Sequence, residues 1–100
     1  MSQSFEWDPA KATSNERKHG VRFELAMRVF LDPLAVTRQD RIEGGERRWQ
    51  TIGMVDGMLL LLVAHTVRED EDEDVGEVIR IVSARLATRK EKRDYEQENG

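Results

Sequence analysis

The feature that most constrains this sequence is an apolar run in its middle that directly follows a turn signal. Residues 58–64 are all apolar, and Asp56-Gly57 just before them is a dipeptide typical of tight β-hairpins. A run of this length fits a strand buried on both faces, because a membrane-spanning helix needs about 20 apolar residues. The sequence therefore predicts a central strand over residues 59–66, joined by the hairpin to a strand over residues 47–54.

A short strand and a helix are expected before this hairpin. Residues 5–7 have the character of an edge strand, Asp8 is a typical N-cap, and Pro9 fits the first helical position. A polar helix is expected over residues 11–19, and Gly20 is expected to close it in the left-handed conformation.

A second helix is predicted by an apolar stripe that starts at Phe23 and repeats at i+3, i+4 and i+7. Asp32-Pro33 is expected to end this helix, since the residue before a proline avoids the helical region. A strand is then expected to begin within residues 35–37, and residues 43–45 are expected to form a loop.

The last part of the chain predicts one more strand and a final helix. Residues 78–84 alternate as a strand, Thr88 and Glu91 have the spacing of a capping box, and residues 96–100 are expected to fray. The expected fold is α+β, in a single domain over residues 1–100. It has a mainly antiparallel sheet of three to four strands, two N-terminal helices and one C-terminal helix. The helices are expected on one face of the sheet, which leaves the other face open.

Composition excludes several classes of site. A chain of 100 residues without cysteine has no disulfide, thiolate metal site or cysteine nucleophile. Its two histidines, His19 and His65, are too few for a histidine-based metal site without carboxylates. Residues 1–6 lack the basic start and apolar stretch of a secretory signal, so the cytoplasm is the expected compartment. Neither a cofactor nor a membrane partner is expected.

The net charge of −4 conceals an uneven distribution of charge. Residues 69–74 are all acidic, and the rest of the chain has 16 basic and 14 acidic residues, a net charge of +2. Residues 80–93 contain six basic residues and one acidic residue. A basic RNA-binding surface is therefore compatible with the acidic total, and residues 69–77 are expected to form a solvated acidic loop.

Three blocks of residues form a pattern that covers nearly the whole chain. They are Phe5-Glu6-Trp7-Asp8, Lys11, Asn15, Lys18-His19-Gly20-Val21, Phe23, Ala26 and Phe30; then Glu46, Arg48, Trp49 and Ile52-Gly53; and finally Ile79-Arg80-Ile81-Val82-Ser83-Ala84-Arg85, Ala87, Arg89, Glu91 and Tyr95. With these blocks in this order, the chain resembles the BrnT family of bacterial toxins.

The resemblance implies a fold similar to that of the RelE-type toxins and a ribonuclease activity that stops protein synthesis. It also implies RNA as the substrate and a BrnA-like antitoxin as the partner, with operator DNA bound only through the antitoxin. The acidic run over residues 69–74 departs from the family pattern, because it lengthens a connection that is normally short. Beside an RNA-binding face, this run would repel phosphate.

Five residues are candidates for catalysis. RNA is cut without a metal ion when one group deprotonates the 2′-hydroxyl, another protonates the leaving 5′-oxygen, and cations stabilise the phosphate. Arg85 and Arg48 are candidate cations that neighbouring strands are expected to aim at one phosphate, although Arg85 alternatively only anchors the final helix. His19 and His65 are candidates for proton transfer, with a helix-end role and a core position as alternatives. Glu46 is either a base or the ion-pair partner of Arg48.

Five more residues are candidates for binding RNA. Lys11 and Lys18 share a helical face, which either follows the RNA backbone or is simply solvated. Arg80 lies either on the working face of the sheet or in an ion pair beneath a helix, and Arg89 belongs to the basic C-terminal stretch. Tyr95 either stacks on a base or packs the final helix onto the sheet.

Two other function classes remain open at this stage. A non-catalytic module of the same fold would bind only a partner protein, for example one that binds DNA. A metal-assisted nuclease would use carboxylates such as Asp40, Glu43 and Glu46, although their spacing matches no metal motif.

Overall fold

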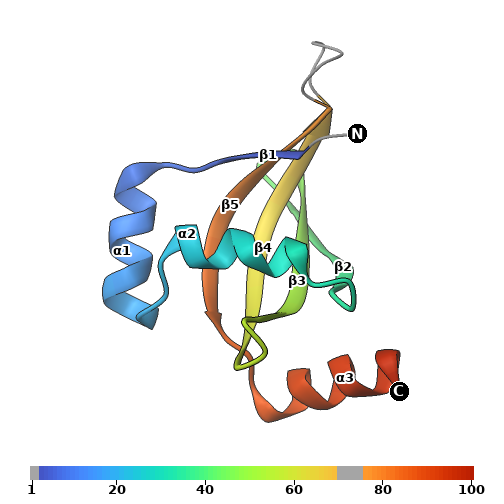
Figure 1. Cartoon of the computed structure of the whole chain (residues 1–100). Helices are drawn as coiled ribbons and strands as arrows, with labels where there is room; N and C mark the ends of the chain where they lie inside the picture. The colour runs from blue at the N-terminus through green and yellow to red at the C-terminus, as the bar shows by residue number, and fades with distance from the viewer. Residues whose placement is uncertain (1–2, 70–75) are drawn as a thin grey trace.

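The structure, a computed structural model, describes residues 3–69 and 76–100. Within these residues, five strands form one sheet in the order β1-β5-β4-β3-β2 (Figure 1). β1 runs parallel to β5, and every other neighbouring pair is antiparallel. The strands are β1 (Gln3–Glu6), β2 (Val36–Glu43), β3 (Glu46–Val55), β4 (Leu59–Glu69) and β5 (Glu77–Leu86).

This sheet corrects the prediction of three to four mainly antiparallel strands. The fifth strand is the expected N-terminal edge segment, which pairs with β5 from the far end of the chain and places Phe5 opposite Ile79. The predicted central strand is confirmed, since β4 is the middle strand of the five. Most of the expected acidic loop, residues 70–75, lies outside the described residues, and Glu69 is the last residue of β4.

The helices begin and end where the capping signals predict. The helical segments are α1 (Pro9–His19), α2 (Phe23–Ala26), η1 (Met27–Leu31) and α3 (Arg89–Asn99). The Asp8 carboxylate accepts a hydrogen bond from Ala10 N at 2.9 Å, and Gly20 closes α1 with a φ of 71°. Thr88 and Glu91 form the predicted capping box at the start of α3.

Two helical predictions need correction. The second helix is only four residues of α-helix, α2, and it continues as the 3₁₀-helix η1, a conformation common where short helices end. α3 extends to Asn99, beyond the point where fraying is expected. Its last residue is tied down, because Asn99 Nδ2 donates to Leu34 O and to Tyr95 O, both at 2.9 Å.

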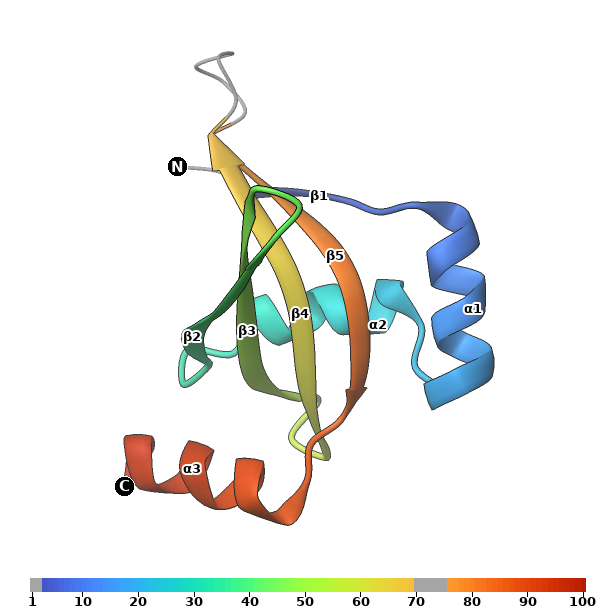
Figure 2. The same cartoon turned by 180° about the vertical axis from the view of Figure 1, so that it is seen from behind.

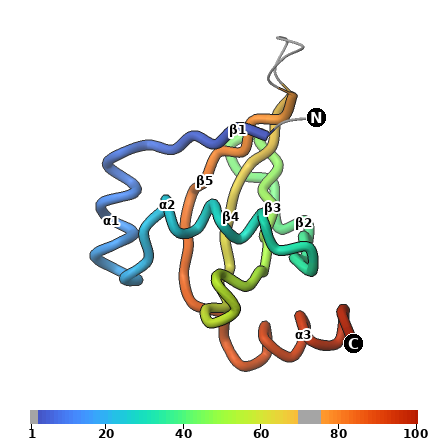
Figure 3. The backbone as a smooth tube through the Cα atoms, in the orientation of Figure 1, coloured from blue at the N-terminus to red at the C-terminus, as the bar shows by residue number. Residues whose placement is uncertain are grey.

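The two faces of the sheet carry different layers. On one face, which we call the covered face, Phe23, Ala26 and Val29 of α2 and η1 pack against residues such as Leu61 and Val63 of β4. Figure 3 shows this helical segment crossing the strands on that side. On the opposite face, the open face, Tyr95 of α3 forms a smaller cluster with Ile52 and Leu62. Figure 2 shows α3 at the end of the sheet where β5 ends.

The expectation that all helices pack on one face is therefore wrong. α3 packs on the face opposite α2 and η1, because β4 is apolar on both faces and its even-numbered leucines also need cover. The open face is nevertheless only partly covered. In the described part of the chain, α3 covers the end of the open face near the β3–β4 turn. The other end of this face carries polar side chains.

The edge of β5 is closed by a side chain from α1. β1 pairs only with the first part of β5, and α1 lies beside the remainder (Figures 1 and 2). Asn15 is 6% exposed; its Nδ2 donates to Ala84 O at 2.9 Å and to Val21 O at 3.0 Å, and its Oδ1 accepts from Ala84 N at 3.1 Å. One amide side chain thus takes the place of a neighbouring strand, because it satisfies both backbone groups of Ala84.

Gly53 lets η1 lie close against β3. A Cβ on residue 53 would lie 2.6 Å from Val29 Cγ1 and 2.9 Å from Val29 O, and a backbone oxygen cannot rotate away. We expect Gly53→Ala to destabilise the fold by about 2 kcal/mol through overpacking. In an uncrowded strand the same change would stabilise by roughly 0.5–1 kcal/mol. The sign of the change in urea midpoint therefore tests the close contact, and a higher midpoint would contradict it.

Candidate functional site

The open face carries a set of arginines. In a sheet, residues paired across strands share a face, and residues two apart along a strand do so as well. The pairings of Arg38 with Gln50, Gln50 with Ala64, and Thr66 with Arg80 therefore place all of these residues on one face. By the same register the face holds five arginines: Arg38 from β2, Arg48 from β3, Arg68 from β4, and Arg80 and Arg85 from β5.

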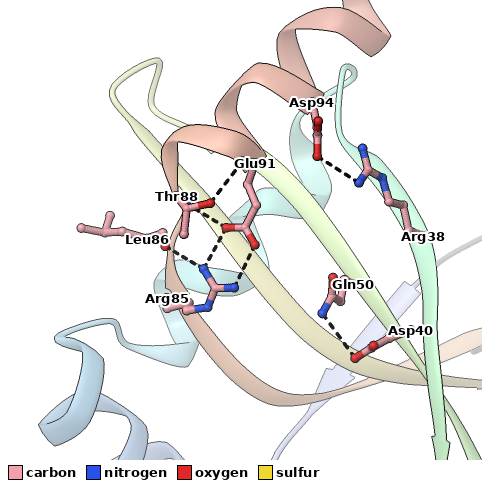
Figure 4. Close-up of polar contacts among 8 residues, drawn as sticks. All are labelled: Arg38, Asp40, Gln50, Arg85, Leu86, Thr88, Glu91 and Asp94. Atoms are coloured by element: carbon pink, nitrogen blue, oxygen red, sulfur yellow. Dashed lines mark hydrogen bonds and ion pairs between the residues drawn. The ribbon is translucent and has the colours of Figure 1, made fainter.

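Arg85 is held in place by the first turn of α3, as Figure 4 shows. Its Nη1 and Nη2 donate to the two carboxylate oxygens of Glu91, each at 2.8 Å, and Nη1 also donates to Leu86 O at 3.2 Å. Glu91 Oε1 also accepts from Thr88 N at 2.8 Å. The hydrogen bonds from Arg85 lower the pKa of Glu91 to about 2, and the same contact raises the pKa of Arg85.

This contact leaves part of the Arg85 guanidinium available. Glu91 occupies the end of the planar group, and Nε makes no hydrogen bond within the described residues. A guanidinium has five N–H donors, so the Nε side of Arg85 can still take an anion while Glu91 fixes its plane. Arg85 therefore does anchor the final helix, which was its alternative role in the sequence analysis. This anchoring leaves some of its N–H donors free.

Arg85 and Arg48 do not lie on neighbouring strands, which corrects the prediction that they meet at one phosphate. β4 separates β3 from β5. Arg85 pairs with Leu62 of β4. Arg48 comes just before Trp49, which pairs with His65 of β4, so Arg48 stands level with the next β4 residue, Thr66. The two arginines are therefore offset by about four residues, or about 13 Å, along the strands.

Arg48 is paired with a different carboxylate from the one predicted. Its Nε lies 3.7 Å from Glu43 Oε2, and this Nε is buried with no hydrogen-bond partner in the described part of the chain. Glu46 is exposed and pairs in register with Glu43 at the β2–β3 hairpin. Glu46 is thus not the ion-pair partner of Arg48, because Glu43 takes that position across the turn.

α1 brings three candidate residues together at the edge of β5. Lys11, Lys18 and His19 line a shallow pocket of about 180 Å³ with Val82 and Ser83. The register of β5 changes here, since Ala64 pairs with Ser83 and His65 pairs with Ile81, which leaves Val82 as an extra residue. Ser83 shares the open face with Arg85, two residues further along β5, so the pocket and Arg85 are neighbours.

His65 lies in the core and not in this site, contrary to its place among the catalytic candidates. It is 2% exposed on the covered face, its Nε2 lies 2.7 Å from Thr51 Oγ1, and its ring packs 5.0 Å from that of Phe30. Burial lowers its pKa. Because β4 places it on the covered face, its side chain does not reach RNA on the open face.

Tyr95 and Arg89, two candidates for binding RNA, both belong to α3. Tyr95 packs α3 onto the sheet, as its structural alternative predicts: its hydroxyl donates to Asp32 Oδ2 at 2.7 Å, and burial together with this contact raises its pKa to about 12. A buried ring does not stack on a base. Arg89 is exposed on a different side of α3, beside Lys92 and Arg93.

Sequence reasoning missed Arg38, Arg68 and Glu6 as members of the open face. Arg38 Nη1 contacts Asp94 Oδ2 at 3.3 Å, and Glu6 contacts both Arg68 and Arg80 (Figure 4 shows the first contact). Arg68 and Thr66 are two residues apart in β4, so the sequence indicates that their side chains share a face. Which face this is becomes clear only from the register with β5.

Among the described residues there is neither a cluster of metal ligands nor a helix that could span a membrane. Within residues 3–69 and 76–100, no three histidine or carboxylate side chains lie close enough together to hold a metal ion, and this includes Asp40, Glu43 and Glu46. Across the same ranges, none of the helices has the length and apolar character needed to cross a membrane.

Comparisons with known proteins agree with this architecture. The profile of the BrnT ribonuclease toxins of type II toxin–antitoxin systems matches residues 7–91. The crystal structure of the ribonuclease toxin BrnT from Brucella abortus superposes with a TM-score of 0.60 at 22% sequence identity. The match covers 89% of this chain and 100% of that one. The comparison with curated proteins finds no match.

Proposed function

The chain belongs to the BrnT family of ribonuclease toxins of type II toxin–antitoxin systems, and we propose that it cuts RNA on the open face of its sheet without a metal ion. The main support for this site is Arg85, a guanidinium fixed by Glu91 at the edge of a face that carries four other arginines. An arginine fixed in this way binds the phosphate at the cleaved bond and stabilises the charge that develops there.

His19 is the proposed proton-transfer group. It lies in the pocket with Ser83, and Ser83 and Arg85 are two residues apart on one face, a separation of about 7 Å. A phosphate on Arg85 therefore brings its flanking riboses close to the His19 imidazole, and histidine is the side chain that most often serves as a general acid or base. Lys11 and Lys18 in the same pocket contact the RNA backbone on this side.

The remaining proposed contacts position the RNA. Arg48 and Arg80 lie further along the open face, on either side of β4, and bind phosphates other than the one at the cleaved bond. Glu46 stands at the hairpin next to Glu43, so we assign it no proton transfer. This assignment replaces the expected pairing of Arg48 with Arg85 at a single phosphate.

A protein antitoxin is the proposed partner. Type II systems neutralise the toxin with a protein, and the open face is the surface whose occlusion would stop RNA from binding. We propose a BrnA-like antitoxin that covers this face and carries the only contact with operator DNA. Cleavage by the free toxin then inhibits translation.

Metal independence is tested with a chelator. We expect the purified protein to cut a mixed-sequence RNA at a rate that changes less than about twofold when excess EDTA is added, because arginines supply the positive charge that a metal would supply. A metal-dependent nuclease in parallel verifies the chelation. Loss of cutting in EDTA, restored by Mg²⁺, would contradict the proposal. A chain that neither cuts RNA nor stops growth when expressed alone would favour the binding-module alternative.

A further inference from the structure

A cluster at the end of the open face far from α3 contains Arg80, which is proposed above to bind a phosphate, together with Arg68 and Glu6, which have no role so far. β1 pairs Glu6 with Arg80 of β5, and β4 places Arg68 on the same face. Glu6 Oε2 accepts from Arg80 Nη1 at 3.2 Å, and Glu6 Oε1 accepts from Arg68 Nη1. One carboxylate from the N-terminus thus holds two guanidinium groups side by side.

The charge and donors of this cluster suit a phosphate. The three side chains together carry a net charge of +1, and those of Arg80 and Arg68 are 38% and 56% exposed. Each guanidinium has five N–H donors, and Glu6 contacts a single nitrogen of each. The remaining donors of the two groups converge on one anion more readily than those of two unlinked surface arginines, because the shared carboxylate fixes their spacing.

We propose that Arg68 and Arg80, positioned by Glu6, form a second phosphate-binding subsite for the RNA substrate, distinct from the cleavage position at Arg85. This inference rests on the proposed function and adds to it a distant anchoring point. Glu6 is a positioning residue here, since it contacts the arginines and not the RNA.

The register of the sheet sets the distance between the two positions. Thr66 pairs with Arg80 and Leu62 pairs with Arg85, so the two levels are four residues apart on β4. That is about 13 Å along the sheet. One strand of a DNA duplex advances about 3.4 Å per nucleotide, and an extended strand advances further. With a similar spacing in RNA, the subsite holds a phosphate roughly two to four nucleotides from the cleaved bond. The preferred substrate is therefore an RNA strand that continues past the cut by at least this length.

Binding of an uncleavable RNA tests the subsite directly. The probe is a fluorescent 12-nucleotide 2′-O-methyl RNA of mixed sequence, which lacks the nucleophilic 2′-hydroxyl, measured by anisotropy from 50 to 300 mM salt. We expect Arg68→Gln and Arg80→Gln each to weaken binding by about 5- to 10-fold and to reduce the slope of log K against log salt by about 0.7. The matched control is Arg28→Gln, which removes an arginine paired with Asp56 outside the open face.

Glu6→Gln separates positioning from simple charge. Removing this negative charge would tighten RNA binding if Glu6 only repelled the substrate. We expect it instead to weaken binding about threefold, because Arg68 and Arg80 lose their common partner. Tighter binding by Glu6→Gln would overturn the positioning role.

Substrate length provides an independent measurement. On a 30-nucleotide RNA, Arg80→Gln should raise KM about 5- to 10-fold with kcat unchanged, whereas on a dinucleotide with only the cleaved phosphate it should change neither constant. If the wild-type protein binds and cuts RNA but the Arg68 and Arg80 variants behave like Arg28→Gln, the subsite is wrong and the proposed function stands. Wild-type protein that neither binds nor cuts RNA would overturn the proposed function as well.

Discussion

Replacing Arg85 by alanine should lower RNA cleavage at least ~100-fold, the scale seen when a fixed donor to a developing negative charge is removed. The loss should appear mainly in kcat, because the proposed contact stabilises the transition state at the cleaved phosphate. The measurement is cleavage of a mixed-sequence RNA by equal amounts of folded protein, with the variant purified in parallel to exclude a contaminating nuclease.

Glu91→Gln is the matched control, because Arg85 also anchors α3. Both variants break the ion pair between Arg85 and Glu91, yet only Arg85→Ala removes the guanidinium. Glutamine retains the capping-box interaction with Thr88, so α3 keeps its start. We expect Glu91→Gln to keep cleavage within about fivefold of wild type, since the cation remains on the open face. Equal losses in both variants would reduce Arg85 to an anchor of the helix.

Replacing Asn15 by alanine should destabilise the fold by about 3 kcal/mol, because buried backbone groups that lose a partner cost roughly 1–3 kcal/mol each. The side chain makes three hydrogen bonds to backbone groups of Val21 and Ala84. Water replaces some of the lost hydrogen bonds at the edge of β5, so the expected loss of stability is smaller than three times the full cost of an unpaired group. For a domain of 100 residues this corresponds to a drop in Tm of about 12–24 °C.

Arg17→Ala on the exposed side of α1 is the control for this change, since alanine is at least as good a helix former and Arg17 is exposed. Thermal unfolding followed by circular dichroism measures both variants. A Tm for Asn15→Ala within about 4 °C of wild type, a shift that corresponds to no more than ~1 kcal/mol, would show that the edge of β5 does not depend on this amide.

Local signals in the sequence predicted the boundaries of several elements. Asp8, Gly20, and the pair of Thr88 and Glu91 mark helix ends that the structure places where expected. Asp56-Gly57 forms the predicted turn, with φ values of 55° and 68°. These features were predictable because a cap or a turn satisfies backbone groups within a few residues of itself.

The position of the final helix and the strand count were harder to predict. Nothing in residues 3–6 shows that this segment pairs in parallel with β5, more than 70 residues away. The apolar character of β4 predicted burial on both faces but not which helix covers which face. Both outcomes depend on how the whole chain buries apolar surface, which no short window contains.

The candidate site was only partly predictable for the same reason. The sequence by itself determined the residue types and the strands that carry them: Arg48 and Arg80 in strands, His19 at a helix end, and Arg85 before the final helix. Only the tertiary structure decided that Arg85 meets Glu91, that Glu6 links Arg68 to Arg80, and that His65 points into the core. The physical reason is register, since a shift of one residue in strand pairing moves a side chain to the opposite face of the sheet.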